Sequence, residues 1–326
     1  MIKNLLIWVL KDDRPGNYNQ AINLANALAI NYEIKEICYN KLAILPNFLK
    51  FGSFLTIDKS SKNNLINQKI KPNIIISAGR RSALIALDLK KIYPNLFLIN
   101  IMNPVHNIEK FDLIIAPKHD CLKADNVLEI IGSISQIKKK SIEENSQKFS
   151  DVFNKIKSPK IALLIGGSSK NSQFKLEDAQ NLRNITDKLC KNMKANLLVT
   201  TSRRTDKFII DEIKKDNKNI KYFFEWKKDA PNPYFAILNT ADYIIATGDS
   251  ITMCCEICYL GKPAYIYSNK NICSKKHLKF LNDLFVGNFA IKLSCDLEEL
   301  GKKKLNKLDE VNKLKAKIKE RLKICL

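Results

Sequence analysis

The chain has 326 residues, of which 45% are hydrophobic and 27% are charged. This composition is typical of a globular protein with a hydrophobic core and is too apolar for a disordered chain. No apolar run approaches the ~20 residues that a membrane-spanning helix needs, and the run Leu5–Leu10 is too short for a signal peptide. We therefore expect a cytoplasmic protein, with a place at the inner face of a membrane left open.

The chain is strongly basic, with 55 Lys and Arg against 33 Asp and Glu and a net charge of +22. One interpretation is drift toward AT-rich codons, since Lys, Asn and Ile are abundant together. The other is attraction to an anionic membrane or to phosphates. No recognition motif supports nucleic-acid binding. The nine cysteines are expected to be reduced and mostly buried, and we expect no metal site and no cofactor.

The first half of the chain alternates apolar runs with amphipathic segments. Ala21, Leu24, Ala25 and Leu28 recur at helical spacing, which predicts a helix after Asn17. A second helix is predicted from Arg81 to about Lys91, and the polar segment Lys138–Lys157 is interpreted as a junction. The predicted strands are Leu5–Leu10, Ile34–Cys38, Ile74–Ser77, Leu96–Ile101, Leu113–Ala116 and Val127–Ile131.

The second half repeats this alternation. Its predicted strands are Ile161–Ile165, Leu197–Thr201, Tyr222–Trp226, Tyr243–Thr247 and Ala264–Ser268. The predicted helices are Leu176–Met193, Tyr234–Thr240, one from Ser250 to Gly261, and a basic one from Leu297. The fold class is therefore α/β, with two Rossmann-like doubly wound parallel sheets facing a cleft. We expect domains at residues 1–155 and 156–290, followed by a basic C-terminal helix at 291–326.

Three loops of the second half follow predicted strands and suit a nucleotide. Paired glycines can present backbone N–H groups to a phosphate, although the spacing is not that of a Walker loop. Two consecutive arginines offer forks for a pyrophosphate, and a glutamate can accept both hydroxyls of a ribose. The residues expected there are Gly166, Gly167, Lys170, Arg203, Arg204, Ser250 and Glu256.

Two loops of the first half suit an acceptor. Arg14, Asn17 and Gln20 stand at the opening of a helix, whose N-terminus favours anions. Arg80 and Arg81 follow another strand. Asp13 and His119 are alternative general bases. Each of these loops also has a simpler interpretation, as a capped turn or a solvated surface.

A separate stretch, Leu42–Leu55, mixes aromatic residues, leucines and lysines. It is interpreted either as an amphipathic segment that contacts a membrane or a lipid-linked acceptor, or as ordinary core packing under a long loop.

Taken in order over about residues 5–285, these motifs resemble the mitochondrial-fission, elongated-mitochondria-like family, as a bacterial-type member. The matching segments are 8–20, Ile76–Ser82, Ala116–Asp120, Leu164–Lys170, Thr200–Thr205, Asn232–Ala236, Asp249–Glu256 and Gly261–Pro263. The family in turn is similar to glycosyltransferases of the B-type fold. The segment Ile101–Val105 departs from the family, which is expected to carry an acidic-basic pair after a Gln there.

The resemblance implies a nucleotide-sugar site in the second half and an acceptor site in the first. The two glycines and two arginines would then face the diphosphate, Ser250 would lie near it, and Glu256 would hold the ribose. The function expected is a metal-independent glycosyltransferase that uses a nucleotide-diphosphate sugar, with a lipid or envelope glycan as acceptor. The alternatives are a non-catalytic scaffold that retains the fold, and a sugar-nucleotide epimerase.

Overall fold

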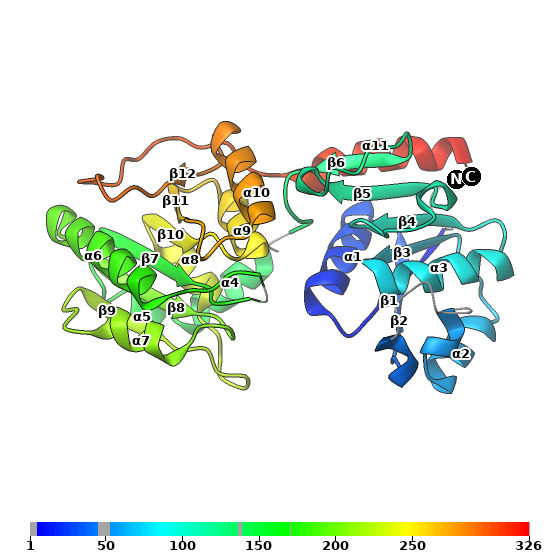
Figure 1. Cartoon of the computed structure of the whole chain (residues 1–326), viewed down its shortest axis with the longest axis horizontal. Coiled ribbons are helices and arrows are strands. Elements are labelled where there is room, and N and C mark those ends of the chain that lie inside the picture. Colours follow the sequence, from blue (N-terminus) through cyan, green and yellow to red (C-terminus); the bar gives the residue numbers. More distant parts are fainter. Residues whose placement is uncertain (1–4, 45–52, 136–138, 170, 326) are drawn as a thin grey trace. The chain divides into compact units, whose positions relative to one another are not determined.

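The computed structural model describes residues 5–44, 53–135, 139–169 and 171–325 (Figure 1). It divides the chain into two compact units. Unit 1 comprises Met1–Ser135 with Asp309–Leu326, and unit 2 comprises Gln136–Leu308. Each contains one six-stranded parallel sheet with flanking helices, which confirms the two predicted Rossmann-like sheets.

The sheet of unit 1 has the strand order β2-β1-β3-β4-β5-β6, and all of its neighbouring strands are parallel. Four of the strands are almost wholly apolar because helices cover both faces of the sheet. The strands are β1 (Leu6–Lys11), β2 (Asn31–Glu36), β3 (Ile74–Ala78), β4 (Phe97–Ile101), β5 (Leu113–Pro117) and β6 (Val127–Ile130). The helices are α1 (Pro15–Leu28), α2 (Lys59–Ile66), α3 (Arg80–Ile92) and α11 (Glu310–Cys325).

Unit 1 has two hydrophobic cores, one on each face of its sheet. Successive side chains of a strand point to opposite faces. Ile7 and Val9 therefore pack with α1 and α11, whereas Trp8 and Leu10 pack with α2 and α3. The basic helix at the C-terminus thus covers the core of the first unit, through Val311, Leu314, Ile318 and Leu322.

This last helix begins later than the sequence predicts, at Glu310 instead of residue 291 or Leu297. The preceding segment is irregular because its backbone bonds elsewhere: Leu308 N–H donates to the Cys258 carbonyl at 3.1 Å and Asn306 N–H to that of Asn288 at 2.9 Å. These bonds replace the i to i−4 bonds of a helix. The segment up to Leu308 therefore belongs to unit 2.

The sheet of unit 2 has the order β12-β11-β10-β7-β8-β9. Its strands are β7 (Lys160–Ile165), β8 (Asn196–Thr201), β9 (Ile220–Phe224), β10 (Tyr243–Thr247), β11 (Ala264–Tyr267) and β12 (Ile291–Lys292). Its helices are α4 (Lys139–Lys148), α5 (Ser150–Phe153), α6 (Leu176–Met193), α7 (Lys207–Lys214), α8 (Tyr234–Thr240), α9 (Ile251–Leu260) and α10 (Lys275–Val286).

The boundary between the units lies at Ser135, earlier than residue 155. The segment interpreted as a junction forms α4 and α5, and α4 packs on α8. Asn145 makes this contact specific: its Nδ2 donates to the Asn232 carbonyl at 2.9 Å, and its Oδ1 accepts from Ala236 N–H at 2.8 Å.

In both sheets the strand order reverses next to the first strand, between β1 and β3 in unit 1 and between β7 and β10 in unit 2. Ligands of doubly wound folds bind outside the carboxyl ends of the strands at such a point. The loops that follow β1, β3, β7, β8 and β10 are therefore the first places to look for a site.

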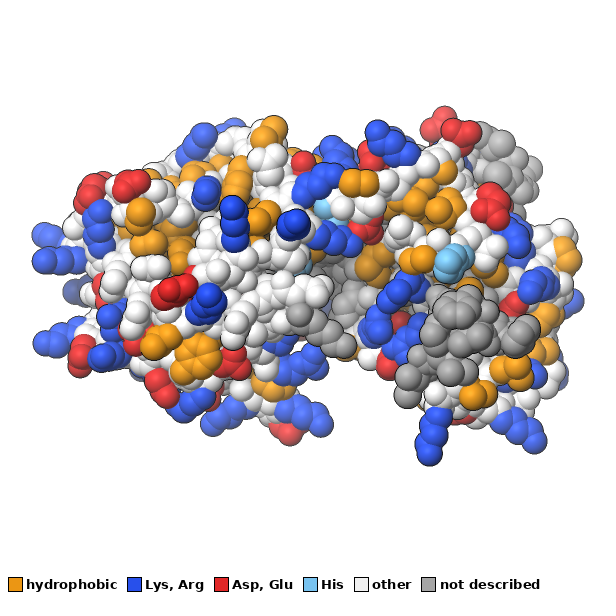
Figure 2. All heavy atoms as spheres, in the orientation of Figure 1, with side chains coloured by type: hydrophobic (Ala, Val, Ile, Leu, Met, Phe, Trp, Pro, Cys, Tyr) orange, Lys and Arg blue, Asp and Glu red, His pale blue; other side chains and the backbone are white. Residues whose placement is uncertain are grey.

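No helix of the described ranges is both long and apolar enough to cross a membrane. Figure 2 shows Lys and Arg side chains spread over the face in view and interspersed with Asp and Glu. The net charge therefore marks no single site on this face. Residues 45–52, most of the stretch interpreted as a membrane or acceptor contact, lie outside the described residues.

Candidate functional site

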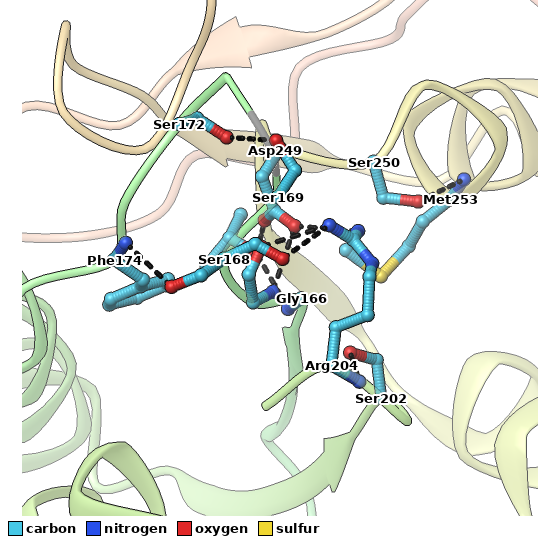
Figure 3. A network of polar contacts seen from close by, with 12 residues as sticks. Gly166, Ser168, Ser169, Ser172, Phe174, Ser202, Arg204, Asp249, Ser250 and Met253 are labelled. Atoms are coloured by element: carbon cyan, nitrogen blue, oxygen red, sulfur yellow. Dashed lines mark hydrogen bonds and ion pairs between the residues drawn. The ribbon is translucent and has the colours of Figure 1, made fainter. Parts of the chain in front are cut away.

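In unit 2, three strand-following loops meet on the carboxylate of Asp249, a residue that is 3% exposed and whose side chain is fully covered. Thr247 Oγ1 donates to its Oδ1 at 2.6 Å, and Gly167 N–H donates to its Oδ2 at 2.8 Å. Arg204 Nη2 lies 2.9 Å from the same Oδ2 (Figure 3). One buried anion thus joins the loops after β7, β8 and β10, and we call this arrangement the Asp249 brace.

The two glycines after β7 are required by this brace. A Cβ on Gly166 would lie 2.0 Å from Asp249 Oδ2, and one on Gly167 would lie 1.9 Å from the Arg204 carbonyl oxygen. Their N–H groups, which the sequence assigns to a diphosphate, donate instead to Thr247 Oγ1 and to Asp249. In this structure the glycines serve close contact between loops.

The two consecutive arginines after β8 have different surroundings. Arg204 donates to the carbonyls of Gly167 and Ser168 at 3.0 and 3.2 Å as well as to Asp249, so its guanidinium is held by the chain itself. Arg203 is exposed and forms no side-chain hydrogen bond or ion pair with any described residue. Only Arg203 is therefore free to bind an anion. Lys170 lies outside the described residues.

Ser250 is the N-cap of α9. Its Oγ accepts a hydrogen bond from Met253 N–H at 3.4 Å (Figure 3). A serine at this position satisfies one of the N–H groups that a helix leaves unpaired. Its hydroxyl therefore has a structural role, and the helix start that it caps carries no acidic residue in its first turn.

Glu256 lies on the second turn of α9 and accepts a hydrogen bond from Tyr234 Oη at 2.7 Å. Burial raises the pKa of Glu256 to about 6, although the Tyr234 hydrogen bond lowers it. This bond goes to Oε2, and Oε1 has no hydrogen bond to a described residue. The carboxylate is therefore oriented by one partner and keeps one oxygen open.

In unit 1, the two consecutive acidic residues after β1, Asp12 and Asp13, have different surroundings, as Arg203 and Arg204 do in unit 2. Asp12 is 5% exposed and accepts from Arg14 N–H at 3.0 Å and from Asn17 Nδ2 at 3.4 Å. Burial raises the pKa of Asp12. Asp13 is exposed and forms an ion pair with Arg81, Oδ1 to Nη2, at 2.6 Å. Its carboxylate is therefore already engaged in the structure.

The other residues expected on the acceptor side divide into free and engaged groups. Gln20 is buried: its Nε2 donates to the Gly16 carbonyl at 2.8 Å and its Oε1 accepts from Ile134 N–H at 3.1 Å. Gln20 thereby joins α1 to the segment that follows β6. Arg14 and Arg80 are exposed and have no side-chain ion pair with a described residue.

His119 lies on a 3₁₀ turn, Lys118–Asp120, directly after β5. Its side chain is only 4% exposed, and Nε2 lies 3.8 Å from Asp120 Oδ1. Strands β1 and β5 are separated by β3 and β4, which at the usual strand spacing is roughly 14 Å. Asp13 and His119 therefore stand at different places along the edge and remain alternatives.

A comparison with known proteins identifies the family. The model of the family described as mitochondrial fission ELM1 matches residues 15–322. The chain belongs to this family. The membership confirms the resemblance drawn from the ordered motifs.

Two relatives show how far the family similarity extends. Uncharacterized protein RP120 of Rickettsia prowazekii (strain Madrid E) is 32% identical, over 98% of this chain and 99% of its own length. Mitochondrial fission protein ELM1 of Arabidopsis thaliana is 27% identical over 248 residues, which cover 66% of this chain and 56% of that protein.

Solved structures support the fold. The UDP-GlcNAc 2-epimerase of Methanocaldococcus jannaschii is similar with a TM-score of 0.57 and 12% identity, over 97% of this chain and 99% of that one. The Neisseria meningitidis UDP-GlcNAc 2-epimerase bound to UDP-GlcNAc has a TM-score of 0.54, 11% identity and coverage of 98% and 94%. Arabidopsis thaliana UGT89C1 complexed with UDP-L-rhamnose has a TM-score of 0.54, 10% identity and coverage of 97% and 90%.

Within the ELM1-family chain, one further motif has a structural role. Lys262 of the segment Gly261–Pro263 donates from Nζ to the carbonyls of Leu238, Asn239 and Ala241, at 3.0, 2.6 and 2.8 Å. A cation at this place stabilises the unpaired carbonyls at the end of α8. Lys262 thereby helps to hold the helix that carries Tyr234.

Two residues of interest were not selected from the sequence. Asp249 belongs to the matching segment Asp249–Glu256, but nothing in the sequence indicates that it binds the loops after β7 and β8. Tyr39 follows β2 without any motif, yet Arg81 Cζ lies 4.4 Å from the centre of its ring. Only the pairing of β1 with both β2 and β3 brings these side chains together.

Proposed function

We propose that this chain binds a nucleotide-diphosphate sugar at the carboxyl edge of the unit 2 sheet and transfers the sugar to a hydroxyl acceptor without a metal ion. The observation that carries the proposal is that some polar groups around the Asp249 brace are bound by the chain itself whereas others are open to a ligand. The brace fixes the loops after β7, β8 and β10, and it leaves the Arg203 guanidinium and Oε1 of Glu256 open.

Glu256 suits the ribose. A carboxylate accepts hydrogen bonds from two neighbouring hydroxyls, and this one is already oriented by Tyr234 at 2.7 Å. With a pKa of about 6, raised by burial, Glu256 is mostly ionised at neutral pH. The nucleoside would therefore lie along the first turns of α9.

Arg203 suits the diphosphate. Its fork can bind phosphate oxygens at two points, and its position is set by the neighbouring Arg204, which the brace holds. In transfer, the leaving nucleoside diphosphate gains negative charge as the bond to the sugar breaks. The Arg203 guanidinium and the start of a helix would stabilise that charge.

Unit 1 would supply the acceptor side, with a lipid or envelope glycan at the inner face of a membrane as the acceptor. Asp13 or His119 would take the proton of the acceptor hydroxyl, for which the base must come within about 3 Å of that oxygen. For Asp13 this requires that the ion pair with Arg81 at 2.6 Å open or be shared.

A thermal-shift series with UDP and UDP-GlcNAc tests the proposal. A ligand at 100 times its Kd adds about 2.7 kcal/mol to the stability of the folded state, which a melting curve detects. We expect Arg203→Ala and Glu256→Gln to reduce the shift strongly. Lys215→Ala, which removes an exposed cation at the end of α7, should leave it unchanged. A shift that both site variants retain would contradict the assignment.

The same samples separate the alternatives. Release of UDP only after an acceptor extract is added supports transfer. Interconversion of the sugar without acceptor supports an epimerase, the activity named for the Methanocaldococcus and Neisseria structures of similar fold. If no nucleoside diphosphate or nucleotide sugar stabilises the chain, a non-catalytic scaffold role is favoured instead. The Arabidopsis relative is named as a mitochondrial fission protein.

A further inference from the structure

Arginine is rare in this chain, and its placement in unit 1 is uneven. The 55 basic residues include only seven arginines. Three of them, Arg14, Arg80 and Arg81, stand at the beginnings of two helices. Arg14 is the N-cap of α1, and Arg80 and Arg81 are the first two residues of α3. Both helices follow strands at the carboxyl edge of the same sheet.

The beginnings of these two helices touch each other. A Cβ on Gly79, the residue before Arg80, would lie 2.7 Å from Asn17 Nδ2 in the first turn of α1. Gly79 has a φ of +81°, so the chain turns into α3 through a conformation that favours glycine. The close approach of the two helix starts puts the three arginines at neighbouring backbone positions on this edge.

Two side chains contact Arg81 at this place. Its guanidinium lies over the Tyr39 ring, with Cζ 4.4 Å from the ring centre, and pairs with Asp13 at 2.6 Å. Arg81 Nε and Tyr39 Oη are both buried without a hydrogen bond to a described residue. Buried polar atoms are usually hydrogen-bonded, so both atoms mark unmet hydrogen-bonding capacity that the surrounding side chains cover.

The charges at this place favour an anion. Two carboxylates, Asp12 and Asp13, stand against three guanidinium groups. Neither helix has an acidic residue in its first turn or a side-chain cap on its N–H groups. The positive ends of both helix dipoles therefore add to the excess positive charge of the guanidinium groups. Arg14 and Arg80 are exposed and free to move toward a ligand.

We infer that Arg14, Arg80 and Arg81, with Tyr39, form a binding site for a phosphate group. Three guanidinium groups offer more hydrogen-bond donors than one planar carboxylate can accept. A phosphomonoester has three terminal oxygens and carries up to two negative charges. Binding of phosphate at this site stands on unit 1 alone. Its assignment to the acceptor, which would then be a phosphorylated glycan or lipid, rests on the proposed function.

Titration calorimetry of the full chain with inorganic phosphate and glycerol 3-phosphate tests the site, with glycerol and matched NaCl as blanks. We expect the double variant Arg14→Gln/Arg80→Gln to raise the Kd about tenfold or more, since each change removes a charged hydrogen-bonding group. Lys62→Gln/Lys69→Gln removes the same charge from exposed positions of unit 1 and should leave the Kd unchanged. Equal Kd values in both double variants would overturn the site.

A second arm identifies the source of the phosphate. If the Arg14→Gln/Arg80→Gln variant binds UDP as tightly as the unaltered chain does, and UDP does not compete with glycerol 3-phosphate, the phosphate belongs to an acceptor. If UDP competes and its binding falls in parallel, the acceptor assignment is overturned. A chain that binds glycerol 3-phosphate through these arginines but shows no response to UDP contradicts the proposed function and leaves the phosphate site intact.

Discussion

Arg204 Nη2 lies 2.9 Å from Oδ2 of Asp249, and the Asp249 side chain has no exposed surface. A carboxylate that has lost its water in this way depends on the groups that replace the water. Here these are the Arg204 guanidinium, the Gly167 N–H and the Thr247 hydroxyl. Arg204, whose guanidinium is well suited to bind a ligand phosphate, therefore binds the carboxylate of Asp249 instead.

We expect Arg204→Ala to destabilise unit 2 by about 3 kcal/mol, because it leaves the buried Asp249 carboxylate without its counter-ion. Arg203→Ala removes the same side chain one residue earlier, at an exposed position, and should change the free energy of unfolding by less than about 0.5 kcal/mol. Urea unfolding of the two variants measures the difference. Equal stabilities would show that the ion pair between Arg204 and Asp249 contributes nothing to the stability of unit 2.

Gly167→Ala should destabilise unit 2 by about 1–3 kcal/mol, because the added methyl overlaps the Arg204 carbonyl and forces the loops apart. Gly16→Ala is the matched control in unit 1. No atom lies within 4 Å of the Cβ position there, and alanine favours the first turn of α1, so we expect stabilisation by about 0.4–1 kcal/mol. A destabilised control or an unaffected Gly167→Ala variant would contradict the packing described.

The stability of unit 2 should depend on pH through Glu256. Burial raises the pKa of Glu256 from 4.5 to about 6, so the folded state holds this proton more tightly than the unfolded state does. Ionisation of Glu256 therefore lowers stability as the pH rises through this range. Glu256→Gln cannot ionise, and its stability relative to the unaltered chain should rise between pH 4.5 and pH 7.

Tyr234→Phe provides the control for this dependence. The Tyr234 hydrogen bond lowers the pKa of Glu256, so its loss should move the pH-dependent range to higher pH. Urea unfolding at several pH values measures both variants. A stability difference between Glu256→Gln and the unaltered chain that stays constant from pH 4.5 to pH 7 would contradict the assignment.

The C-terminal helix should stabilise unit 1 although it follows unit 2 in the sequence. Ile318 is fully buried in the core formed with α1, so Ile318→Ala should cost about 2–5 kcal/mol. Lys317→Ala changes an exposed neighbour and should have little effect. Hydrogen exchange locates the loss: faster exchange is expected in α1 and β3 and unchanged exchange in α6. Destabilisation confined to α6 would show that the helix belongs elsewhere.

The spacing of hydrophobic residues predicts helices correctly where a single local pattern determines the helix. The spacing of Ala21, Leu24, Ala25 and Leu28 predicts α1, and all four residues are buried in its core. The pattern misleads at the C-terminus, where it predicts a helix from Leu297 that would include Leu300, Leu305 and Leu308. They are buried, but in an irregular segment held by bonds to distant carbonyls.

The site shows the same division. The motifs place every candidate loop after a strand, because β-branched runs, glycines and arginine pairs are local features. They could not show that Arg203 stays free while Arg204 is bound, or that Asp13 is paired and Asp12 buried. Those differences arise from hydrogen bonds between loops 37 to 82 residues apart.

The amino-acid sequence by itself determined the alternation of strands and helices, the two parallel sheets and the family, because each depends on neighbours along the chain. The tertiary structure alone decided which polar groups remain available to a ligand. The strand order places β7 between β8 and β10 and β1 between β2 and β3. A buried charged group must be paired, and the side chains that this order places beside it are the available partners.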